Sequence, residues 1–412
     1  MIERPEYVSK LIAYKDTDFI KVITGVRRCG KSTLLKLFAN HLTRHGVGQD
    51  RIITINYESL LSSDLRDPKL LHEYVGEKVE AANGEPLYVF IDEAQEIEQW
   101  AYVMNSLKAT FPVDLYVTGS NSKLFAGEDL TYITGRYIEL RMYPLSFKEF
   151  VAFRGLRSDD ECSSQNTPPV SYEKALNDYL SQGSFPAVAL SPNQELVQAI
   201  TQGLIDSIVM RDVVQRGRID NDASFQRVAQ FVFGAVGSEI SANKIANTLK
   251  SAGYSVTANT VDRYLNLLCD AFVLYKCQRY DIRGKERLRF NGKYYVVDTG
   301  LRNAFLGERP RDFGHVLENV VYMELLRRDY EVTVGRIGAK EIDFVAVNGT
   351  EKVYVQVAST LVEVAVQERE FSALLAVRDA YPKYVVSMDE IDYSRDGIRH
   401  LNIVPFLLGA PL

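Results

Sequence analysis

Short apolar runs alternate with amphipathic stretches along the first 142 residues. The apolar runs are rich in Val, Ile and Tyr, and several are apolar on both faces, as buried parallel strands are. They predict strands at residues 19–24, 51–56, 87–92, 114–119 and 136–142. Helical spacing of apolar residues predicts helices between them, at residues 31–44, 69–82 and 95–109. This alternation predicts a doubly wound α/β layer with a parallel sheet.

The pattern changes in the middle of the chain. Residues 155–170 are polar and end in paired prolines, which predicts an exposed insertion. The following residues predict helices at 172–180, 195–215, 242–250 and 257–269, and then strands at 272–280 and 293–298. Ser241 is a candidate N-cap for the helix at 242–250. Helix, turn, helix and a two-stranded wing follow one another in a winged helix-turn-helix.

The last hundred residues predict a second α/β unit. Its strands are rich in Val, Ile and Tyr, and helical patterns lie before and between them. The predicted helices are at residues 312–328 and 367–378, and the predicted strands at 331–336, 342–347, 353–358 and 383–387.

Residues 25–32 match the phosphate-loop motif GxxxxGK[ST] in full. They follow an apolar strand and open a helix, as the motif requires. Backbone amides of such a loop and of the helix N-terminus converge on phosphate oxygens. Lys31 adds a positive charge there, and the Ser32 hydroxyl is a candidate Mg²⁺ ligand. The expected nucleotide-binding residues are Gly25, Val26, Arg27, Arg28, Cys29, Gly30, Lys31, Ser32 and Thr33.

Two adjacent carboxylates follow the apolar strand at residues 87–92. Asp92 is expected to hold Mg²⁺ through water, and Glu93 to orient or deprotonate the attacking water. The next strand ends in residues 117–121, where Asn121 is a candidate contact for the γ-phosphate or the water. Arg136 is a candidate charge stabiliser for the transferred phosphoryl group, either in the same chain or from a neighbour.

Composition sets the class of protein. At about 150 residues per domain, 412 residues predict two to four domains. Hydrophobic residues make up 46% and charged residues 25% of the chain, as in ordinary globular proteins. No apolar run approaches the ~18 residues that span a bilayer, and the charged N-terminus lacks the apolar core of a secretion signal. The four scattered cysteines favour a reducing, cytoplasmic setting.

The net charge of −6 argues against a protein coated with cations for nucleic acid. Residues 276–293, however, hold seven Lys or Arg against two acidic residues. A basic wing of this kind is suited to phosphate contact, or to docking a protein. The helix at 257–269 offers Arg263 as its cation, which favours contact without base readout. The candidate nucleic-acid residues are Arg263, Arg279, Arg283, Lys285, Arg287 and Arg289.

These motifs together resemble the AAA+ ATPases that carry a C-terminal domain related to restriction endonucleases. The resemblance covers nearly the whole chain. It rests on residues 22–32, 90–95, 118–124, 135–136, 143–147, 297–301 and 341–344. It implies an AAA+ ATPase domain with a helical extension over residues 1–215, a winged helix-turn-helix over 216–300 and a degenerate restriction-endonuclease-like domain over 301–412.

Restriction-type nucleases hold Mg²⁺ with a helix carboxylate, a strand Asp and a Glu-x-Lys strand, whose lysine helps to activate water. Glu318 and Asp343 match the first two positions. The third departs from the pattern, because Gln356 stands for Glu and Ala358 for Lys. An alanine cannot activate water, so we expect Glu318, Asp343 and Gln356 to persist as a polar cluster in a binding platform.

The sequence therefore predicts an ATPase that uses ATP and Mg²⁺ and whose nucleotide state biases the winged helix and the nuclease-like domain. Two alternatives remain open. One is a metal-dependent DNA nuclease, and the other is a non-catalytic DNA- or protein-binding module that holds ATP without turnover. Expected partners are ATP, and DNA or a protein at the basic wing; a homo-oligomer is left open, and no membrane is expected.

Overall fold

A computed structural model describes residues 2–122, 130–156, 172–215, 217–219, 222–282, 284, 286–307 and 313–412. At residues 130–131, 215, 222 and 286–291 it describes the backbone alone. The chain forms two compact units. Unit 1 comprises Met1–Tyr143 and Asp270–Phe272, and unit 2 comprises Pro144–Cys269 and Val273–Leu412. The predicted insertion at 155–170 lies largely outside the described residues.

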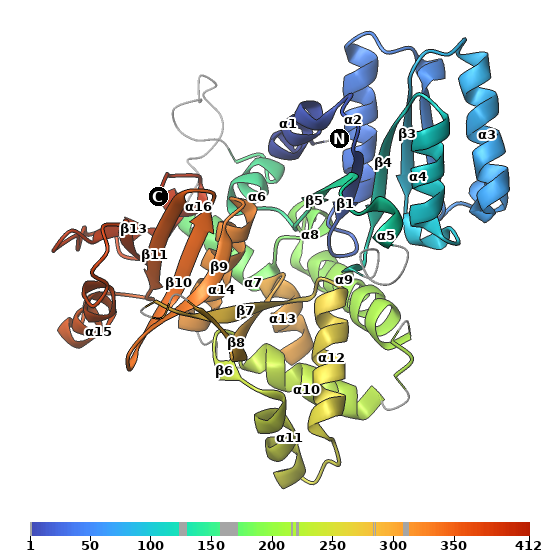
Figure 1. Cartoon of the computed structure of the whole chain (residues 1–412). Coiled ribbons are helices and arrows are strands. Elements are labelled where there is room, and N and C mark those ends of the chain that lie inside the picture. Colours follow the sequence, from blue (N-terminus) through green and yellow to red (C-terminus); the bar gives the residue numbers. More distant parts are fainter. Residues whose placement is uncertain are drawn as a thin grey trace. The chain divides into compact units, whose positions relative to one another are not determined.

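Unit 1 contains a five-stranded parallel sheet in the order β2-β3-β4-β1-β5 (Figure 1). The five predicted strands are confirmed, and every residue of β1, β3 and β4 is buried. The strands are β1 (Ile20–Thr24), β2 (Ile52–Asn56), β3 (Leu87–Asp92), β4 (Val113–Gly119) and β5 (Tyr137–Arg141). This double-sided burial explains why β1, β3 and β4 show no polar alternation.

Helices cover both faces of this sheet. Figure 1 shows α1 and α2 on one side and α3 and α4 on the other. Right-handed crossovers place α2 opposite α3 and α4, because the chain runs from β1 out to β2 and then back through β3 to β4. The helices are α1 (Pro5–Tyr14), α2 (Lys31–Arg44), α3 (Pro68–Ala81), α4 (Trp100–Thr110) and α5 (Leu130–Ile133). Short 3₁₀ turns occur at Gln49–Arg51, Leu60–Ser62, Asp64–Arg66 and Ala94–Glu96.

Unit 2 contains an eight-stranded mixed sheet in the order β13-β12-β11-β10-β9-β7-β8-β6. Its strands are β6 (Glu239–Ile240), β7 (Leu274–Asp281), β8 (Glu286–Val296), β9 (Glu331–Ile337), β10 (Lys340–Asn348), β11 (Glu351–Val357), β12 (Lys383–Ser387) and β13 (Arg399–Asn402). Strand β7 pairs in parallel with β9. The strands expected to form a separate wing therefore belong to the same sheet as the C-terminal strands, so residues 216–300 and 301–412 share one sheet.

The helices of unit 2 follow the predicted order with one local difference. Residues 195–215 were expected to form one helix, but α9 passes at Asp206 into a π-helix that ends at Gln215. The predicted cap is present, because the Ser241 side chain accepts a hydrogen bond from the Lys244 amide at the start of α11. The helices up to α12 are α6 (Phe147–Phe153), α7 (Tyr172–Gln182), α8 (Pro186–Ala189), α9 (Gln194–Ile205), α10 (Asp222–Gly234), α11 (Ala242–Ser251) and α12 (Ala258–Asp270).

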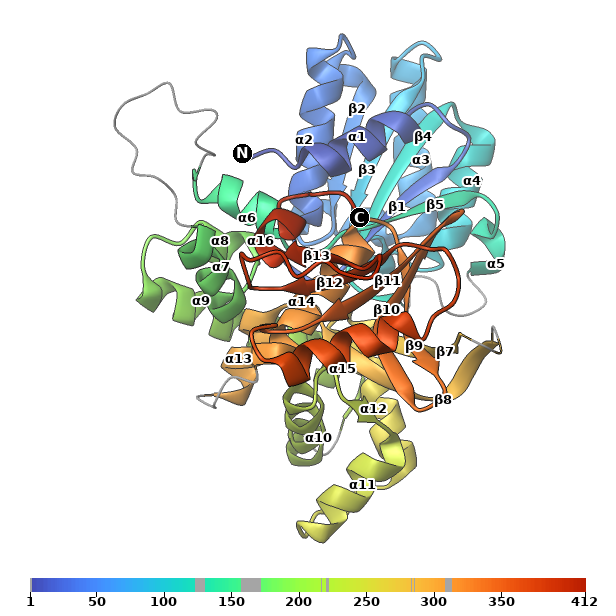
Figure 2. The same cartoon turned by 90° about the vertical axis from the view of Figure 1, so that its left-hand side faces the viewer.

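Helices α14 and α15 pack on opposite faces of the large sheet. Phe344 and Val345 are neighbours in β10, so their side chains point to opposite faces. Phe344 contacts Tyr322 of α14, whereas Val345 shares a hydrophobic core with Phe371 of α15. Figure 2 shows α15 in front of the strands. The remaining helices are α13 (Thr299–Leu306), α14 (Phe313–Arg327), α15 (Val364–Leu375) and α16 (Ile403–Leu407). Within the described ranges, no helix combines the length and apolar character needed to cross a bilayer.

Candidate functional site

The loop over residues 25–30 joins the carboxyl end of β1 to the start of α2. Three of its residues have positive φ: Gly25 at 145°, Arg28 at 63° and Gly30 at 111°. A Cβ atom on Gly25 would lie 2.0 Å from the carbonyl oxygen of Met142, so only glycine fits there. This backbone turns amides toward one point ahead of the helix N-terminus, the arrangement that binds phosphate.

Lys31 is the first residue of α2, and its side chain is buried within the loop. Its Nζ donates hydrogen bonds to the carbonyl oxygens of Gly25 at 2.9 Å and Val26 at 3.1 Å. The first amides of α2, at Ser32 and Thr33, have no preceding helical turn to bond to. The ammonium and the helix N-terminus therefore create positive potential at the same point.

The two adjacent carboxylates lie at the same edge of the sheet as the loop, because β1 and β3 both pair in parallel with β4. Thr118 of β4 connects them. Its hydroxyl donates to Asp92 Oδ1 at 2.5 Å and accepts from the Glu93 amide at 2.9 Å. Glu93 itself has φ of 60°, a left-handed conformation that is uncommon for a residue other than glycine.

The Glu93 carboxylate is held by two neutral side chains. Ser120 Oγ donates to its Oε2 at 3.1 Å, and the Gln95 amide donates to the same oxygen. Asn121 is buried immediately after Ser120. Asn121 could be predicted from this strand end, whereas the roles of Thr118, Ser120 and Gln95 were not predicted. The available signal was a run of polar residues at or after the end of a largely apolar strand.

Arg136 lies at the opposite edge of the sheet. Its carbonyl accepts from the amide of Ile20, the first residue of β1, and its side chain donates to Asn105 at 2.7 Å. The five residues of β1 span about 16 Å. Arg136 is therefore a full strand length from the phosphate loop of its own chain.

Two arginines not selected from the sequence lie beside the loop. Arg141 is opposite Thr24 in the β1–β5 register, at the loop edge, and forms an ion pair with Glu139 at 3.2 Å. Arg4 is buried and donates to the carbonyl oxygen of Cys29 at 3.1 Å. Neither belongs to a recognisable motif, so only the sheet register and the loop packing reveal them.

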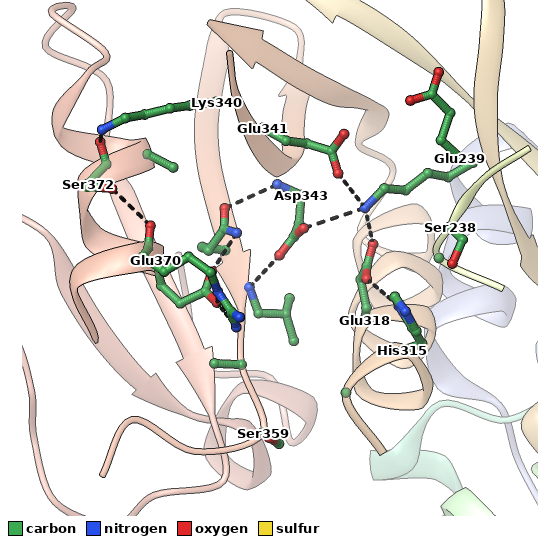
Figure 3. A pocket seen from close by; sticks show the side chains of 18 of the residues that line it. Ser238, Glu239, His315, Glu318, Lys340, Glu341, Asp343, Ser359, Glu370 and Ser372 are labelled. Atoms are coloured by element: carbon green, nitrogen blue, oxygen red, sulfur yellow. Dashed lines mark hydrogen bonds and ion pairs between the residues drawn. The ribbon is translucent and has the colours of Figure 1, made fainter. Parts of the chain in front are cut away.

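A second candidate site lies in unit 2, where a cavity of about 850 Å³ opens between α14, β10, β11 and α15 (Figure 3). Glu318 of α14, Asp343 of β10 and Gln356 of β11 all line it. The register of β10 shifts between Ile342 and Val345, a β-bulge around Asp343. Bulges re-aim side chains next to functional sites. The three residues selected from the sequence are thus brought to one cavity.

The cavity is also lined by a lysine that was not predicted to belong to it. Lys293 of β8 places its Nζ 2.8 Å from Glu318 Oε1, 2.9 Å from Glu341 Oε1 and 3.6 Å from Asp343 Oδ1. Burial lowers the pKa of Lys293, but the carboxylates of Glu318, Asp343 and Glu341 outweigh it and raise the pKa above its ordinary value. Lys293 therefore remains an ammonium.

The carboxylates and the glutamine of this cavity are bonded within the protein. Gln356 accepts from the Asp343 amide at 3.2 Å and donates to Glu370 at 2.6 Å. Asp343 Oδ2 accepts from the Val357 amide at 2.9 Å. Burial, and next the negative charge of Glu318, raise the pKa of Asp343 to about 8.

The candidate nucleic-acid residues that the structure describes are engaged within the chain. Arg263 donates to the carbonyl oxygens of Gly217 at 2.7 Å and Arg218 at 3.3 Å. Arg279 is buried and bonds to Glu239 and Glu341. Arg283 and Lys285 lie outside the described residues, and Arg287 and Arg289 belong to β8 with only their backbone described.

Two protein families match the chain by sequence. The AAA domain matches residues 17–151, and a domain of unknown function, DUF8612, matches residues 173–312. An uncharacterised protein of Haemophilus influenzae is 38% identical over 409 residues, which are 99% of each chain. An uncharacterised protein of Methanocaldococcus jannaschii is 29% identical over 391 residues, covering 93% of this chain and 84% of that protein.

The fold is similar to that of a solved ATPase structure. The Walker-type ATPase paby2304 of Pyrococcus abyssi superposes with a TM-score of 0.50 at 13% sequence identity. The likeness covers 74% of this chain and 96% of that chain. At this identity it shows a shared fold, which agrees with the parallel sheet and phosphate loop of unit 1.

Proposed function

We propose that unit 1 binds and hydrolyses ATP with Mg²⁺. The chain belongs to the same family as the uncharacterised Haemophilus influenzae protein, and its residues 17–151 match the AAA domain. The observation that carries the proposal is the convergence of three groups at one sheet edge. The phosphate loop ends in buried Lys31, and Thr118 is hydrogen-bonded both to Asp92 and to the backbone of Glu93.

The residues at this edge fit a triphosphate and its metal ion. The loop amides and the α2 N-terminus would bind the phosphate oxygens, with Lys31 exchanging its two loop carbonyls for them. The Ser32 hydroxyl and the Asp92 carboxylate are oxygen donors of the kind that Mg²⁺ takes. When bound, Mg²⁺ neutralises charge on the phosphates.

Glu93 is the residue proposed to act on water. Its buried carboxylate is oriented by Ser120 and Gln95, two neutral donors that leave its charge uncompensated. Such a carboxylate can accept a hydrogen bond or a proton from the attacking water. Asn121 follows on the same strand end and remains a candidate contact for that water.

Arg136 is proposed to act on the nucleotide of a neighbouring copy. The length of β1 separates Arg136 from the phosphate loop of its own chain, so the nucleotide that it contacts would be bound by another chain. This role requires a homo-oligomer. Arg141, at the loop edge, is the candidate for the same chain.

The proposal extends to unit 2 as the part that responds to nucleotide state. We propose that residues 216–300 act as a winged helix and residues 301–412 as a restriction-endonuclease-like binding platform. The order of α11, α12, β7 and β8, and the joint position of Glu318, Asp343 and Gln356 on one cavity, support this view. The partner would be DNA or a protein, and the alternative of a module that never turns ATP over stays open.

Turnover by two variants tests the ATPase. Lys31→Ala should lose nucleotide binding, whereas Glu93→Gln should still bind ATP while its turnover falls by a factor of about 100 or more. Glu98→Gln is the matched control, because Glu98 lies in the same segment but is exposed. Wild-type turnover in both Lys31→Ala and Glu93→Gln would refute the proposal.

The DNA and nuclease alternatives need separate measurements. DNA affinity that falls with salt, and falls further when Arg283, Lys285 and Arg287 are neutralised, would support phosphate contact at the wing. DNA cleavage with Mg²⁺ or Mn²⁺ that disappears in Asp343→Ala would support a nuclease. Neither measurement depends on the outcome of the ATPase test.

A further inference from the structure

The resemblance to restriction endonucleases implies a divalent cation in the unit 2 cavity. The donor set there does not fit one. Across the described parts of the chain, no group of three or more His, Cys, Asp or Glu side chains is arranged to hold a metal ion. Figure 3 shows Glu318, Glu341 and Asp343 around one part of the cavity. The reason is that the Lys293 ammonium lies among their carboxyl groups, within 3.6 Å of each.

We infer that Lys293 is a built-in cation that takes the place of a metal ion, so that the cavity is a metal-independent site. The inference goes beyond the proposed ATPase and uses no residue of the phosphate loop. It also explains how the cavity tolerates Ala358: the positive charge comes from β8 instead of β11.

Lys293 is placed as the counter-ion of two carboxylates in the cavity. Its distances of 2.8 Å and 2.9 Å to Glu318 and Glu341 are those of charge-assisted hydrogen bonds. Its side chain is 7% exposed, against 8% for Glu318. Buried carboxylates need a compensating charge, and a lysine supplied by the fold is always present whereas a metal ion must bind.

The other oxygens are also used. Glu318 Oε1 accepts from the Tyr295 hydroxyl at 2.6 Å, and Glu318 Oε2 lies 3.3 Å from His315 Nδ1. The Gln356 oxygen faces the Asp343 amide. A divalent cation would have to break these bonds and overcome repulsion from a fixed ammonium.

The same ammonium excludes the water-activating role of a nuclease lysine. Its Nζ already donates to Glu318 at 2.8 Å and forms an ion pair with Glu341 at 2.9 Å, with Asp343 at 3.6 Å. An ammonium that is held in this way by carboxyl groups is not placed to accept a proton from water. The cavity is thus suited to binding rather than to hydrolysis.

Terbium luminescence tests the inference on the full chain without nucleotide. Tb³⁺ takes oxygen ligands as Ca²⁺ does, and Tyr295, bonded to Glu318, would sensitise an ion in the cavity. We expect the wild type to bind no Tb³⁺ in this cavity, so Asp343→Asn should leave its Tb³⁺ signal unchanged. Lys293→Met, which keeps the stem but not the charge, should gain a saturable signal that Ca²⁺ and Mn²⁺ displace.

Matched variants make the result specific. The Lys293→Met gain should vanish in the double variant with Asp343→Asn. Lys340→Met should gain nothing, because Lys340 lines the same cavity but donates to the Ser372 carbonyl. Millimolar Mn²⁺ should raise the Tm of Lys293→Met by about 5 °C or more and leave the wild type unchanged.

Two outcomes would overturn the inference. One is a Tb³⁺ or Mn²⁺ signal in the wild type that Asp343→Asn abolishes. This comparison does not require that Lys293→Met folds. The other is a folded Lys293→Met that gains no metal affinity. A signal at the nucleotide site is distinguished by its loss in Asp92→Asn, so failure of the ATPase proposal is recognised separately.

Discussion

The hydroxyl of Thr118 donates a hydrogen bond to the carboxylate of Asp92 across the β3–β4 strand pair, with 2.5 Å between the oxygens. The same hydroxyl accepts from the Glu93 amide. One side chain on β4 thus orients the candidate metal ligand and the backbone that carries the candidate base. Neither bond is available to an apolar side chain of the same shape.

Thr118→Val should therefore uncouple binding from turnover. The change removes two hydrogen bonds in a buried setting, which costs about 1–3 kcal/mol in the free energy of unfolding. We expect ATP affinity to change little and turnover to fall by about tenfold or more. Steady-state hydrolysis and urea unfolding measure the two effects. Thr54→Val, at an exposed position of β2, is the control and should be neutral in both.

Gly25→Ala should disable the phosphate loop. Its φ of 145° and the 2.0 Å approach of its absent Cβ to Met142 leave no room for a side chain. We expect loss of detectable nucleotide binding and destabilisation of about 2 kcal/mol or more. Gly46→Ala offers the comparison, because Gly46 also has positive φ but open space around its Cβ, and should cost about 1 kcal/mol. Equal effects of the two changes would contradict the steric argument.

Mixing experiments should reveal an arginine that acts between chains. Arg136→Ala and Lys31→Ala should each have low ATPase activity. A mixture should regain part of the wild-type rate, because one copy then supplies an intact loop and the other an intact Arg136. Activity that stays at the mean of the two separate samples at every ratio would remove Arg136 from catalysis. If Arg141 acts within its own chain, a mixture of Arg141→Ala and Lys31→Ala should not regain activity in the same assay.

The stability of unit 2 should depend on the ionisation of Asp343. Burial and the charge of Glu318 raise its pKa to about 8, whereas in the unfolded chain it is near 4. Between about pH 4 and 8 the folded chain keeps a proton that the unfolded chain has released. Stability relative to Asp343→Asn should therefore fall as the pH rises through that range and then level off.

Thermal unfolding of wild type and Asp343→Asn at about pH 5, 7 and 9 measures this difference. Asp389→Asn should change the pH dependence of stability in the opposite direction. Burial raises the pKa of Asp389, but hydrogen bonds from Leu361, Ser387 and Thr360 outweigh it and lower the pKa below its ordinary value. The stability that Asp389 contributes should be lost at acid pH instead. A pH-independent difference for Asp343→Asn would contradict the raised pKa.

Local pattern was sufficient where the chemistry depends on neighbours in the sequence. The strands of unit 1 could be predicted because β1, β3 and β4 are buried along their whole length and consist mainly of apolar residues. The phosphate loop could be predicted because its glycines, Lys31 and Ser32 are contiguous. The Ser241 cap followed from the residue alone.

Pairings between distant segments could not be predicted in this way. Lys293 was counted with a basic wing, yet it is buried against Glu318, 25 residues away along the chain. Arg279 was a candidate for phosphate contact, but it bonds to Glu239 and Glu341. A cation has the same sequence signature whether it faces solvent or a buried carboxylate.

The sequence alone therefore determined an α/β chain with a phosphate loop followed by two carboxylates, because loop, strand and helix signals are local. The tertiary structure decided which edge of the sheet Arg136 occupies, that Thr118 joins Asp92 to Glu93, and that Lys293 fills the cavity of unit 2. The physical reason is that strand order and register set which side chains meet, and these depend on burial summed over the whole fold.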